Sequence, residues 1–393
     1  MNDIAIASTR PAYAVVVEKD VDVPMRDGVQ LKADVFRPQD GGKFPAILNL
    51  GPYQKDKLWV VPNTLEEPPN KWMNWETSNP NWWVPRGYAA VRIDARGSGK
   101  SPGQYEPWSL AEAVDFYDAI EWAAAQPWCN GKIGLLGISY FAINQWFVAN
   151  LRPPSLKAII PWEGFADLYR DALYHGGILS LFMTNWYTAH LLHHLLGRAA
   201  QHVADGWQVN TLHFWLHNSL DSGALRGSQA QWDKIDVPMF SVGNWSGMGL
   251  HLRGNTEAFM RAATPHKKLR IHLGSHVHPF YTEDGRRDQI RFFDYWLKGI
   301  DNGVMTEPAG EACNPQRGGR FRMAQRARMA ACAHALDQIL SRSVASSGAA
   351  CRRDRHSRSR EAGAYGVAQL CRFEPRHDGL DVGSLIAGDG RGH

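Results

Sequence analysis

The chain has 393 residues, of which 44% are hydrophobic and 21% are charged, and it contains 16 Trp. These totals supply enough apolar material for a large core and exclude an intrinsically disordered chain. No run of eighteen apolar residues occurs, and the first twenty residues lack a basic region followed by an apolar one. We therefore expect a cytoplasmic protein with no membrane segment and no secretory signal.

The formal charge of +4 comes from the end of the chain. Residues 309–393 contain fourteen Arg, no Lys and eight acidic residues, whereas residues 1–308 carry a small negative charge. A nucleic-acid partner would need a basic face on a folded scaffold, so we expect none. Cys129 is the only cysteine before residue 309, and the four later ones lack metal-binding spacing. This usage indicates a reduced compartment and no metal site built from cysteines.

Strands and helices alternate through most of the first 308 residues, which predicts an α/β fold with a doubly wound, mainly parallel sheet. The first two strands flank the turn Arg26-Asp27-Gly28 and predict a hairpin. An amphipathic helix is predicted after Ser109. The strands are expected within residues 15–25, 29–38, 44–53, 86–101, 130–150, 156–164, 237–247 and 267–279.

The pattern changes to helical segments rich in Leu, His and Trp between two of these strands, which predicts a helical cap over residues 166–235. The remaining core is then 1–165 and 236–308. His190, His193 and His194 share one helical face, but no carboxylate accompanies them. We therefore favour amphipathic packing of the cap over a metal site there.

The composition changes abruptly after Pro308, where Ala, Arg, Gly and Ser dominate and no segment alternates as a strand. One interpretation is a disordered Arg-rich tail. The other is a frameshift, because reading one nucleotide later with suitable synonymous codons gives alternating apolar residues and three Trp. We favour a frameshift near Pro308 and expect residues 309–393 to be poorly structured.

Ser139 follows the predicted strand KIGLLG and precedes the helix INQWFVAN. A serine on such a strand-to-helix elbow is typical of the nucleophile of an α/β-hydrolase. The general G-x-S-x-G pattern is broken by Phe141 in its fifth position.

The segment GISYFA resembles the G-x-S-Y-x-G elbow of the cocaine-esterase and X-Pro dipeptidyl-peptidase group, the CocE/NonD-type hydrolases, with Ala142 in place of the last glycine. The resemblance extends over most of residues 23–305 outside the cap. It is carried by VPMRDGVQLKADVFRP, GPYQKD, DARGSGKSPG, EAVDFYDAIEWAAAQPWCNGKIG, LKAIIPW and FFDYWLKG. Family members have a C-terminal jelly-roll domain, whose beginning the frame-shifted text resembles. We therefore expect that domain to be missing here.

The resemblance also implies the site. It assigns an oxyanion hole to the hydroxyl of Tyr53 and the backbone amide of Tyr140, two donors aimed at the developing negative charge. The general base must be a histidine of the segment GSHVHPFY, and the family's register favours His278 over His276.

The third member of the triad departs from the family. Ser246 occupies the position of the family's Asp, and a serine cannot stabilise an imidazolium. Glu163 ends the preceding strand, from which a carboxylate can also reach the histidine. We interpret Glu163 as the substitute acid; a salt-bridged loop glutamate and a triad without a carboxylate are the alternatives.

The reaction we expect is hydrolysis of an ester or amide through an acyl-enzyme, with a small ester, amide or short peptide as substrate. We expect no metal or other cofactor, because this hydrolysis needs none. An aromatic cap favours an esterase over an X-Pro dipeptidyl-peptidase, which must bind a free ammonium group. A hydrolase-like protein with little or no activity is a further alternative, because the family's acid is absent.

Overall fold

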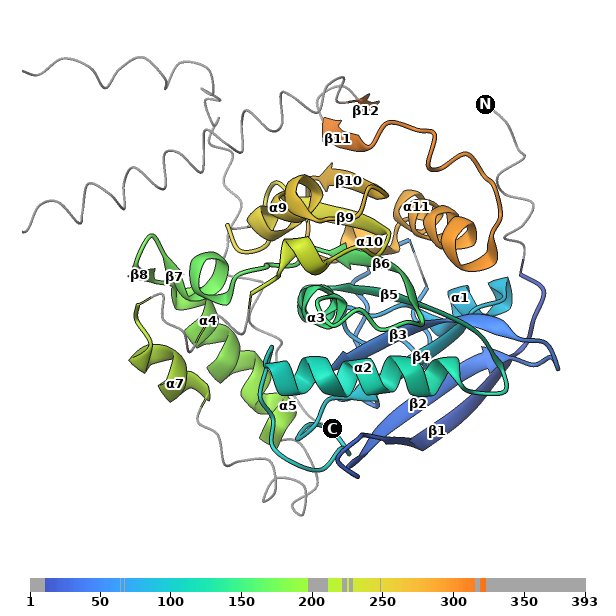
Figure 1. Ribbon diagram of the computed structural model, residues 1–393, viewed down its shortest axis with the longest axis horizontal. Coiled ribbons are helices and arrows are strands. Elements are labelled where there is room, and N and C mark those ends of the chain that lie inside the picture. Colours follow the sequence, from blue (N-terminus) through green and yellow to red (C-terminus); the bar gives the residue numbers. More distant parts are fainter. Residues whose placement is uncertain are drawn as a thin grey trace, which may run out of the picture. The chain divides into compact units, whose positions relative to one another are not determined.

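A ten-stranded sheet runs through the molecule (Figure 1). The structure, a computed structural model, describes residues 11–63, 65–66, 68–196, 211–220, 225, 229–247, 249–314 and 319–322. The chain divides into two units, Met1–Val344 and Ala345–His393, and all of the described residues belong to the first.

The strands of the main sheet are β1 Val15–Pro24, β2 Gln30–Pro38, β3 Phe44–Gly51, β4 Ala89–Asp94, β5 Cys129–Ile138, β6 Leu156–Trp162, β9 Met239–Asn244, β10 Lys267–His272, β11 Gly310–Asn314 and β12 Gly319–Arg322. Their order in the sheet is β1-β2-β4-β3-β5-β6-β9-β10-β11-β12. The strands from β4 to β11 in this order are parallel, and the edge strands β1, β2 and β12 run antiparallel to their neighbours.

The helices are α1 Pro80–Trp83, α2 Leu110–Ala124, α3 Tyr140–Ala149, α4 Leu181–Asn185, α5 Leu192–Leu196, α7 Thr211–His217, α9 Leu252–Arg261, α10 His278–Tyr281 and α11 Glu283–Phe293. Short 3₁₀ segments are η3 Val84–Arg86 and η6 Trp232–Lys234, and π-helical segments are η4 Leu168–Leu173, η5 Trp186–Leu191 and η7 Asp294–Lys298. Among the described residues, no helix has both the length and the apolar character needed to cross a membrane.

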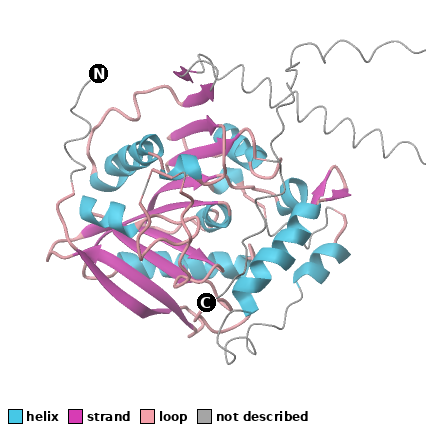
Figure 2. Cartoon of the chain, turned by 180° about the vertical axis from the view of Figure 1, so that it is seen from behind, coloured by secondary structure: helices cyan, strands magenta, loops and turns pink. Residues whose placement is uncertain are grey.

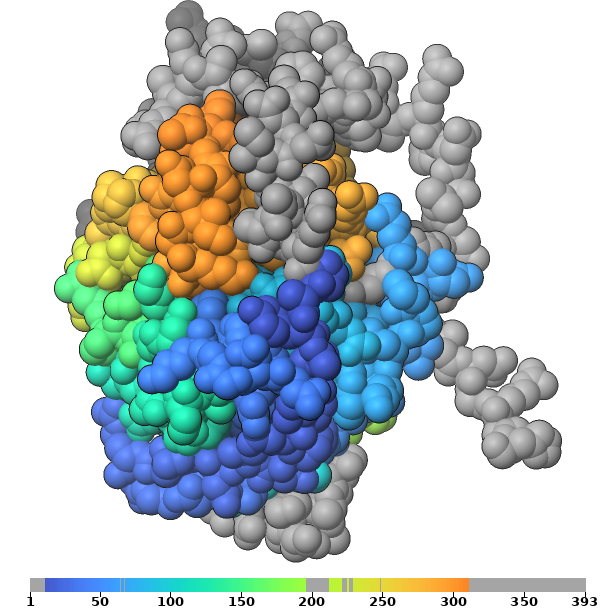
Figure 3. Space-filling model, turned by 90° about the vertical axis from the view of Figure 1, so that its right-hand side faces the viewer, coloured from blue at the N-terminus to red at the C-terminus, as the bar shows by residue number. Residues whose placement is uncertain are grey.

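The first two strands form the predicted hairpin. Gly28 has a positive φ of 89° in the turn, a conformation that glycine adopts without steric cost, and the amide of Met25 donates to the carbonyl of Val29. The register shifts between Glu18 and Val21. Figure 3 shows this hairpin in blue at one end of the molecule and the segment after α11 in orange toward the other.

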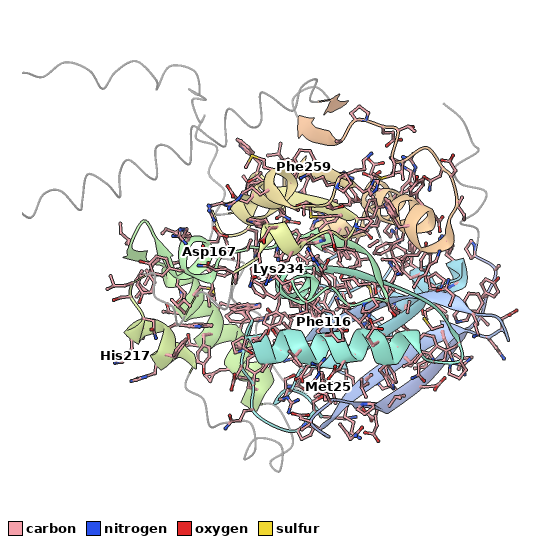
Figure 4. The ribbon with its side chains drawn as sticks, in the orientation of Figure 1. Met25, Phe116, Asp167, His217, Lys234 and Phe259 are labelled. Atoms are coloured by element: carbon pink, nitrogen blue, oxygen red, sulfur yellow. The ribbon has the colours of Figure 1, made fainter. Side chains whose placement is uncertain are left out.

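Helices cover both faces of the parallel sheet, as Figure 2 shows, so the predicted α/β-hydrolase architecture is confirmed. Strands β3 and β4 are buried along their whole length, which explains why they read as continuous apolar runs. Helices α2, α3 and α9 pack on one face, where Phe116 of α2 points toward the sheet (Figure 4). On the other face, α1, α10, α11 and η7 supply the large aromatic side chains of a second core cluster.

Helix α2 begins where the sequence predicts. The hydroxyl of Ser109 accepts a hydrogen bond from the amide of Glu112, and the carboxylate of Glu112 accepts one from the amide of Trp108. These bonds satisfy amide groups that have no partner within the helix.

The described residues between β6 and β9 form short helices and a small two-stranded ribbon, β7 Tyr174–His175 with β8 Ile178–Leu179. Helices α4, α5 and α7 lie together at one side of the ribbon diagram (Figure 1), and His217 marks the outer end of α7 (Figure 4). The insertion contacts the loop after β3, since the side-chain amide of Gln54 donates to the carbonyl of His194.

Two strands lie in the segment that the sequence predicts to be poorly structured. Strand β11 runs parallel to β10, with Leu269 opposite Gly310, and β12 returns antiparallel to β11. The expectation of no strand after Pro308 is wrong for these residues. Edge pairing uses backbone groups that every residue except proline carries, so it needs no alternating apolar pattern. Residues 315–318 and 323–393 lie outside the described residues, and the frameshift stays a prediction.

Candidate active site

Ser139 lies on the sharp turn between β5 and α3. Its backbone has φ 54° and ψ −111°, a conformation that side chains other than glycine rarely adopt. The turn is held by the Ser139 amide, which donates to the carbonyl of Trp162 at 3.0 Å, and by the Ser139 carbonyl, which accepts from the amides of Ala142 and Ile143. Such backbone strain persists where surrounding bonds impose it, often at a functional group.

Glycines beside the elbow make room for its unusual Phe141. A β carbon on Gly51 would lie 2.4 Å from Cε1 of Phe141, and one on Gly137 would lie 2.4 Å from its Cβ. The other departure, Ala142, faces Gly164, where an added β carbon would lie 3.0 Å from Cβ of Ala142. The elbow therefore tolerates Phe141 and Ala142, because the residues that face them are glycines without side chains.

The imidazole nearest to the nucleophile belongs to His251. Its Nε2 lies 3.3 Å from Oγ of Ser139, and the residue is 5% exposed at the start of α9. Burial and the nearby His276 lower the pKa of His251 to about 3, so this imidazole is neutral and can accept a proton.

Glu163 follows β6 and carries its carboxylate into a group of three imidazoles. Its Oε2 lies 2.7 Å from Nδ1 of His276 and 3.9 Å from Nδ1 of His251, and its Oε1 lies 3.0 Å from Nε2 of His272. The backbone of Glu163 has a φ of 54°, and its amide donates to the carbonyl of Val242 at 2.7 Å. Burial opposes ionisation, but the nearby imidazole of His272 and the bond to His276 lower the pKa of Glu163 to about 2. The carboxylate is therefore charged at neutral pH.

His276 lies between two carboxylates. Its Nδ1 bonds to Glu163, and its Nε2 lies 2.9 Å from Oε1 of Glu76. Desolvation lowers the pKa of His276, but the two carboxylates outweigh it and raise the value to about 10. The ring of His276 stacks on that of His251, with centroids 5.3 Å apart and planes inclined by 10°.

Glu76 is a site residue that the sequence analysis missed. It is 3% exposed, has a φ of 59°, and its carbonyl accepts from the amide of Ile138 directly before the nucleophile. Burial raises its pKa, and its Oε2 has no hydrogen-bond partner among the described residues. It belongs to no recognisable motif, and the only local signal is an acidic residue among the tryptophans of NKWMNWETSNPNWW.

His278, the base that the sequence favours, is not hydrogen-bonded to the nucleophile. His278 is partly exposed at the first turn of α10, and its amide donates to the hydroxyl of Ser275. The hydroxyl of Ser139 is instead hydrogen-bonded to His251. The segment after β10 turns into α10 at His278, whereas His276, two residues earlier, lies between Glu163 and Glu76 in the site.

The expected oxyanion donors lie at the same end of the sheet. Tyr53 is buried, its hydroxyl accepts a hydrogen bond of 3.1 Å from the indole of Trp186, and its ring packs edge-on against Tyr140. The amide of Tyr140 is the first of α3, where amides have no partner within a helix. The positive end of this helix favours negative charge.

The cap histidines pack around the same tyrosine. The rings of His190 and His194 each lie 5.1 Å from that of Tyr53 and 4.9 Å from each other, while His193 is exposed. Burial lowers the pKa of His194 to about 3, which leaves it neutral.

Comparison with known proteins shows the family of this chain. The model of the X-Pro dipeptidyl-peptidase (S15) family matches residues 27–278. The chain belongs to this family. A CocE/NonD family hydrolase from Staphylococcus aureus has a similar structure, with a TM-score of 0.70 and 36% identity over 76% of this chain and 53% of that one.

Two curated relatives have different activities in their names. The chain is 39% identical to cocaine esterase from Rhodococcus sp. over 42% of this chain and 27% of that protein. It is 27% identical to a putative Xaa-Pro dipeptidyl-peptidase from Bacillus anthracis over 76% of this chain and 56% of that protein. The matched part thus spans about a quarter to somewhat over half of the length of these proteins.

The loop after β9 holds the serine that stands where the resemblance expects an acid. Ser246, at the position where the resemblance expects Asp, is exposed, and its amide donates to the side chain of Asn244. A β carbon on the next residue, Gly247, would lie 3.7 Å from Oε2 of Glu163. The carboxylate of Glu163, which follows β6, therefore lies beside the loop after β9. The resemblance expects the acid of the triad to come from that loop.

Proposed function

We propose that the chain is a serine hydrolase that cleaves an ester or amide through an acyl-enzyme on Ser139. The observation that carries this proposal is the distance of 3.3 Å between Oγ of Ser139 and Nε2 of His251, on a strained elbow at the N-terminus of α3. This proposal takes His251 as the base in place of His278.

The reaction follows from these groups. Neutral His251 takes the proton of Ser139 as its oxygen attacks the carbonyl carbon, and the imidazolium then gives that proton to the leaving group. Water attacks the acyl-enzyme by the same path in reverse, and the acid is released. Glu163 supplies the negative charge that stabilises the imidazolium, and the amide of Tyr140 with the hydroxyl of Tyr53 holds the oxyanion.

An ester is the favoured substrate, because aromatic side chains of the cap pack around Tyr53. Trp186 stacks with Trp108 and Trp215, and this group also contacts Tyr140. Apolar and aromatic walls bind an acyl or aryl group without requiring a charge.

A second candidate is an X-Pro dipeptidyl-peptidase. The observation that favours it is the buried carboxylate of Glu76, whose Oε2 has no hydrogen-bond partner among the described residues. A buried carboxylate beside the nucleophile can pair with the free ammonium group of a peptide substrate.

Two measurements test these proposals. Labelling by a fluorophosphonate probe is expected for the full chain and lost in Ser139→Ala; no labelling of the parent would favour a hydrolase-like protein without activity. Hydrolysis of p-nitrophenyl acetate but not of Gly-Pro-p-nitroanilide is expected for the esterase, and the reverse preference would establish the peptidase instead.

A further inference from the structure

A cluster of two imidazoles and one carboxylate lies beside the nucleophile. Each of Glu163, His251 and His276 offers one ligand atom, and these three atoms lie within 4.8 Å of one another. Oε2 of Glu163 is the shared neighbour, at 2.7 Å from Nδ1 of His276 and 3.9 Å from Nδ1 of His251. The nearly parallel stacking of the two rings turns both Nδ1 atoms toward the same carboxylate.

We propose that Glu163, His251 and His276 form a binding site for a zinc ion, and that zinc bound there inhibits the hydrolase. Two imidazole nitrogens and one carboxylate oxygen are a common zinc donor set, with metal–ligand distances of about 2.0–2.2 Å and a fourth position left to water. Ligand atoms bound at such distances lie roughly 3–3.5 Å apart in a tetrahedron. Two of the separations here are 2.7 and 3.9 Å, and all three atoms lie within 4.8 Å of one another, which is close to that spacing.

The other nitrogen of each imidazole is already held. Nε2 of His276 lies 2.9 Å from Oε1 of Glu76, which gives the carboxylate–histidine arrangement that orients imidazole ligands of zinc. Nε2 of His251 lies 3.3 Å from Oγ of Ser139. Both rings are therefore oriented with Nδ1 toward Glu163, and a zinc ion would take the place of the Nδ1 proton.

Inhibition follows from the tautomer of His251. A neutral imidazole that binds a metal through Nδ1 carries its proton on Nε2. That nitrogen would then donate to Ser139 and could not accept its proton. The inhibitory part of this inference rests on the proposed function, whereas zinc binding itself does not.

A second cluster of acids serves as a contrast. Asp20, Asp34 and Asp56 also lie close together, but their oxygens are paired with Lys19, Lys55 and Lys100. Three ammonium groups leave no net negative charge for a cation there. The site beside Ser139 combines two imidazoles with a carboxylate, which suits zinc rather than a hard cation such as calcium. Zinc binding there would release the proton on Nδ1 of His276.

Calorimetric titration of the metal-free full chain with zinc chloride tests the site. We expect one tight site that weakens by about 100-fold or more in Glu163→Gln and in His276→Ala, and by about 10–100-fold in Glu76→Gln. The matched control is His213→Ala with His217→Ala, two stacked histidines on α7, which should leave the tight site unchanged. Cobalt in place of zinc should give the visible absorption of a tetrahedral complex, and near-ultraviolet circular dichroism verifies that each variant is folded.

The outcomes separate the two proposals. Ser139→Ala should bind zinc as the parent does, and zinc should slow fluorophosphonate labelling of the parent, with recovery on addition of EDTA. The zinc site alone would be overturned by either of two results. One is a zinc affinity that is unchanged in both Glu163→Gln and His276→Ala, and the other is an active parent that does not bind zinc tightly. Tight zinc binding by a parent that neither reacts with the probe nor hydrolyses esters would overturn the hydrolase proposal and leave the zinc site standing.

Discussion

The indole N–H of Trp186 in the cap donates a hydrogen bond of 3.1 Å to the hydroxyl oxygen of Tyr53 in the loop after β3. This bond occupies a lone pair of the hydroxyl and leaves its proton free to donate. Burial raises the pKa of Tyr53 well above its ordinary value, so the hydroxyl stays protonated. The cap therefore helps to orient a donor that the proposed mechanism directs at the oxyanion.

Replacement of Tyr53 by Phe should lower kcat by about 10²–10³, because one oxyanion donor is lost while the ring remains. Trp186→Phe should give a smaller loss in kcat, since the donor remains but is less well oriented. The measurement is ester hydrolysis at saturating substrate, with Tyr295→Phe on η7 as a control that should match the parent. A Tyr53→Phe enzyme with the parent's kcat would remove this hydroxyl from the mechanism.

His251 and His278 should respond differently to replacement by Ala. We expect His251→Ala to lower kcat by about 10²–10⁴, the contribution of a positioned general base. His278→Ala should leave kcat within about threefold of the parent, because His278 is partly exposed and Ser139 is hydrogen-bonded to His251 instead. The single-turnover rate of acylation of each variant would measure these effects. A large loss of this rate in His278→Ala alone would show that His278 is the base, as the sequence predicts.

Glu163→Gln should lower kcat by about 10⁴, the loss that follows when a triad carboxylate becomes an amide. The charge is present at neutral pH because the pKa of Glu163 is about 2, so the effect should be constant from about pH 5 to 8. Glu257→Gln, a buried carboxylate bonded to Arg261 on α9, is the matched control. Equal kcat in the parent and Glu163→Gln would show that the site works without this carboxylate.

The buried Glu112 should make the fold less stable as the pH rises. Burial raises its pKa to about 8 against hydrogen bonds from Tyr140 and from the amide of Trp108. The folded state therefore holds this proton when the unfolded state, with a pKa of 4.5, has released it. Its contribution to the free energy of unfolding is fully present below about pH 4.5 and is lost as the pH rises through 8.

Urea unfolding of the parent should show a decrease of up to about 4 kcal/mol from this group between pH 5 and 8. Glu112→Gln cannot ionise and should show a smaller decrease, whereas Glu106→Gln, on the exposed loop before α2, should follow the parent. Parallel pH profiles for the parent and Glu112→Gln would contradict this assignment.

The architecture could be predicted because each layer has a local signature. The buried strands β3 and β4 read as continuous apolar runs, Ser109 marks the start of α2, and the turn at Gly28 separates the first two strands. Strands β11 and β12 have no such signature, because backbone pairing with β10 positions them.

The site could be predicted only in part. Ser139 and Tyr53 stand in motifs, and the carboxylate of Glu163 could be inferred from its place after β6. His251 and Glu76 could not, because they are brought together by segments more than 170 residues apart that follow no common pattern. The choice between His276 and His278 depended on where the loop after β10 turns into a helix, which a register taken from relatives does not determine.

Ser139, Glu163 and Glu76 share a positive backbone φ, of 54°, 54° and 59°. Each such residue costs about 1–3 kcal/mol relative to an unstrained backbone, and glycine would relieve that cost at all three positions. Selection for resistance to heat alone would thus tend to replace the very groups that the chemistry needs. Thermal stability and catalytic activity therefore oppose each other at these positions. A thermostable variant would need stabilising substitutions elsewhere, for example at glycines and in exposed loops far from the elbow.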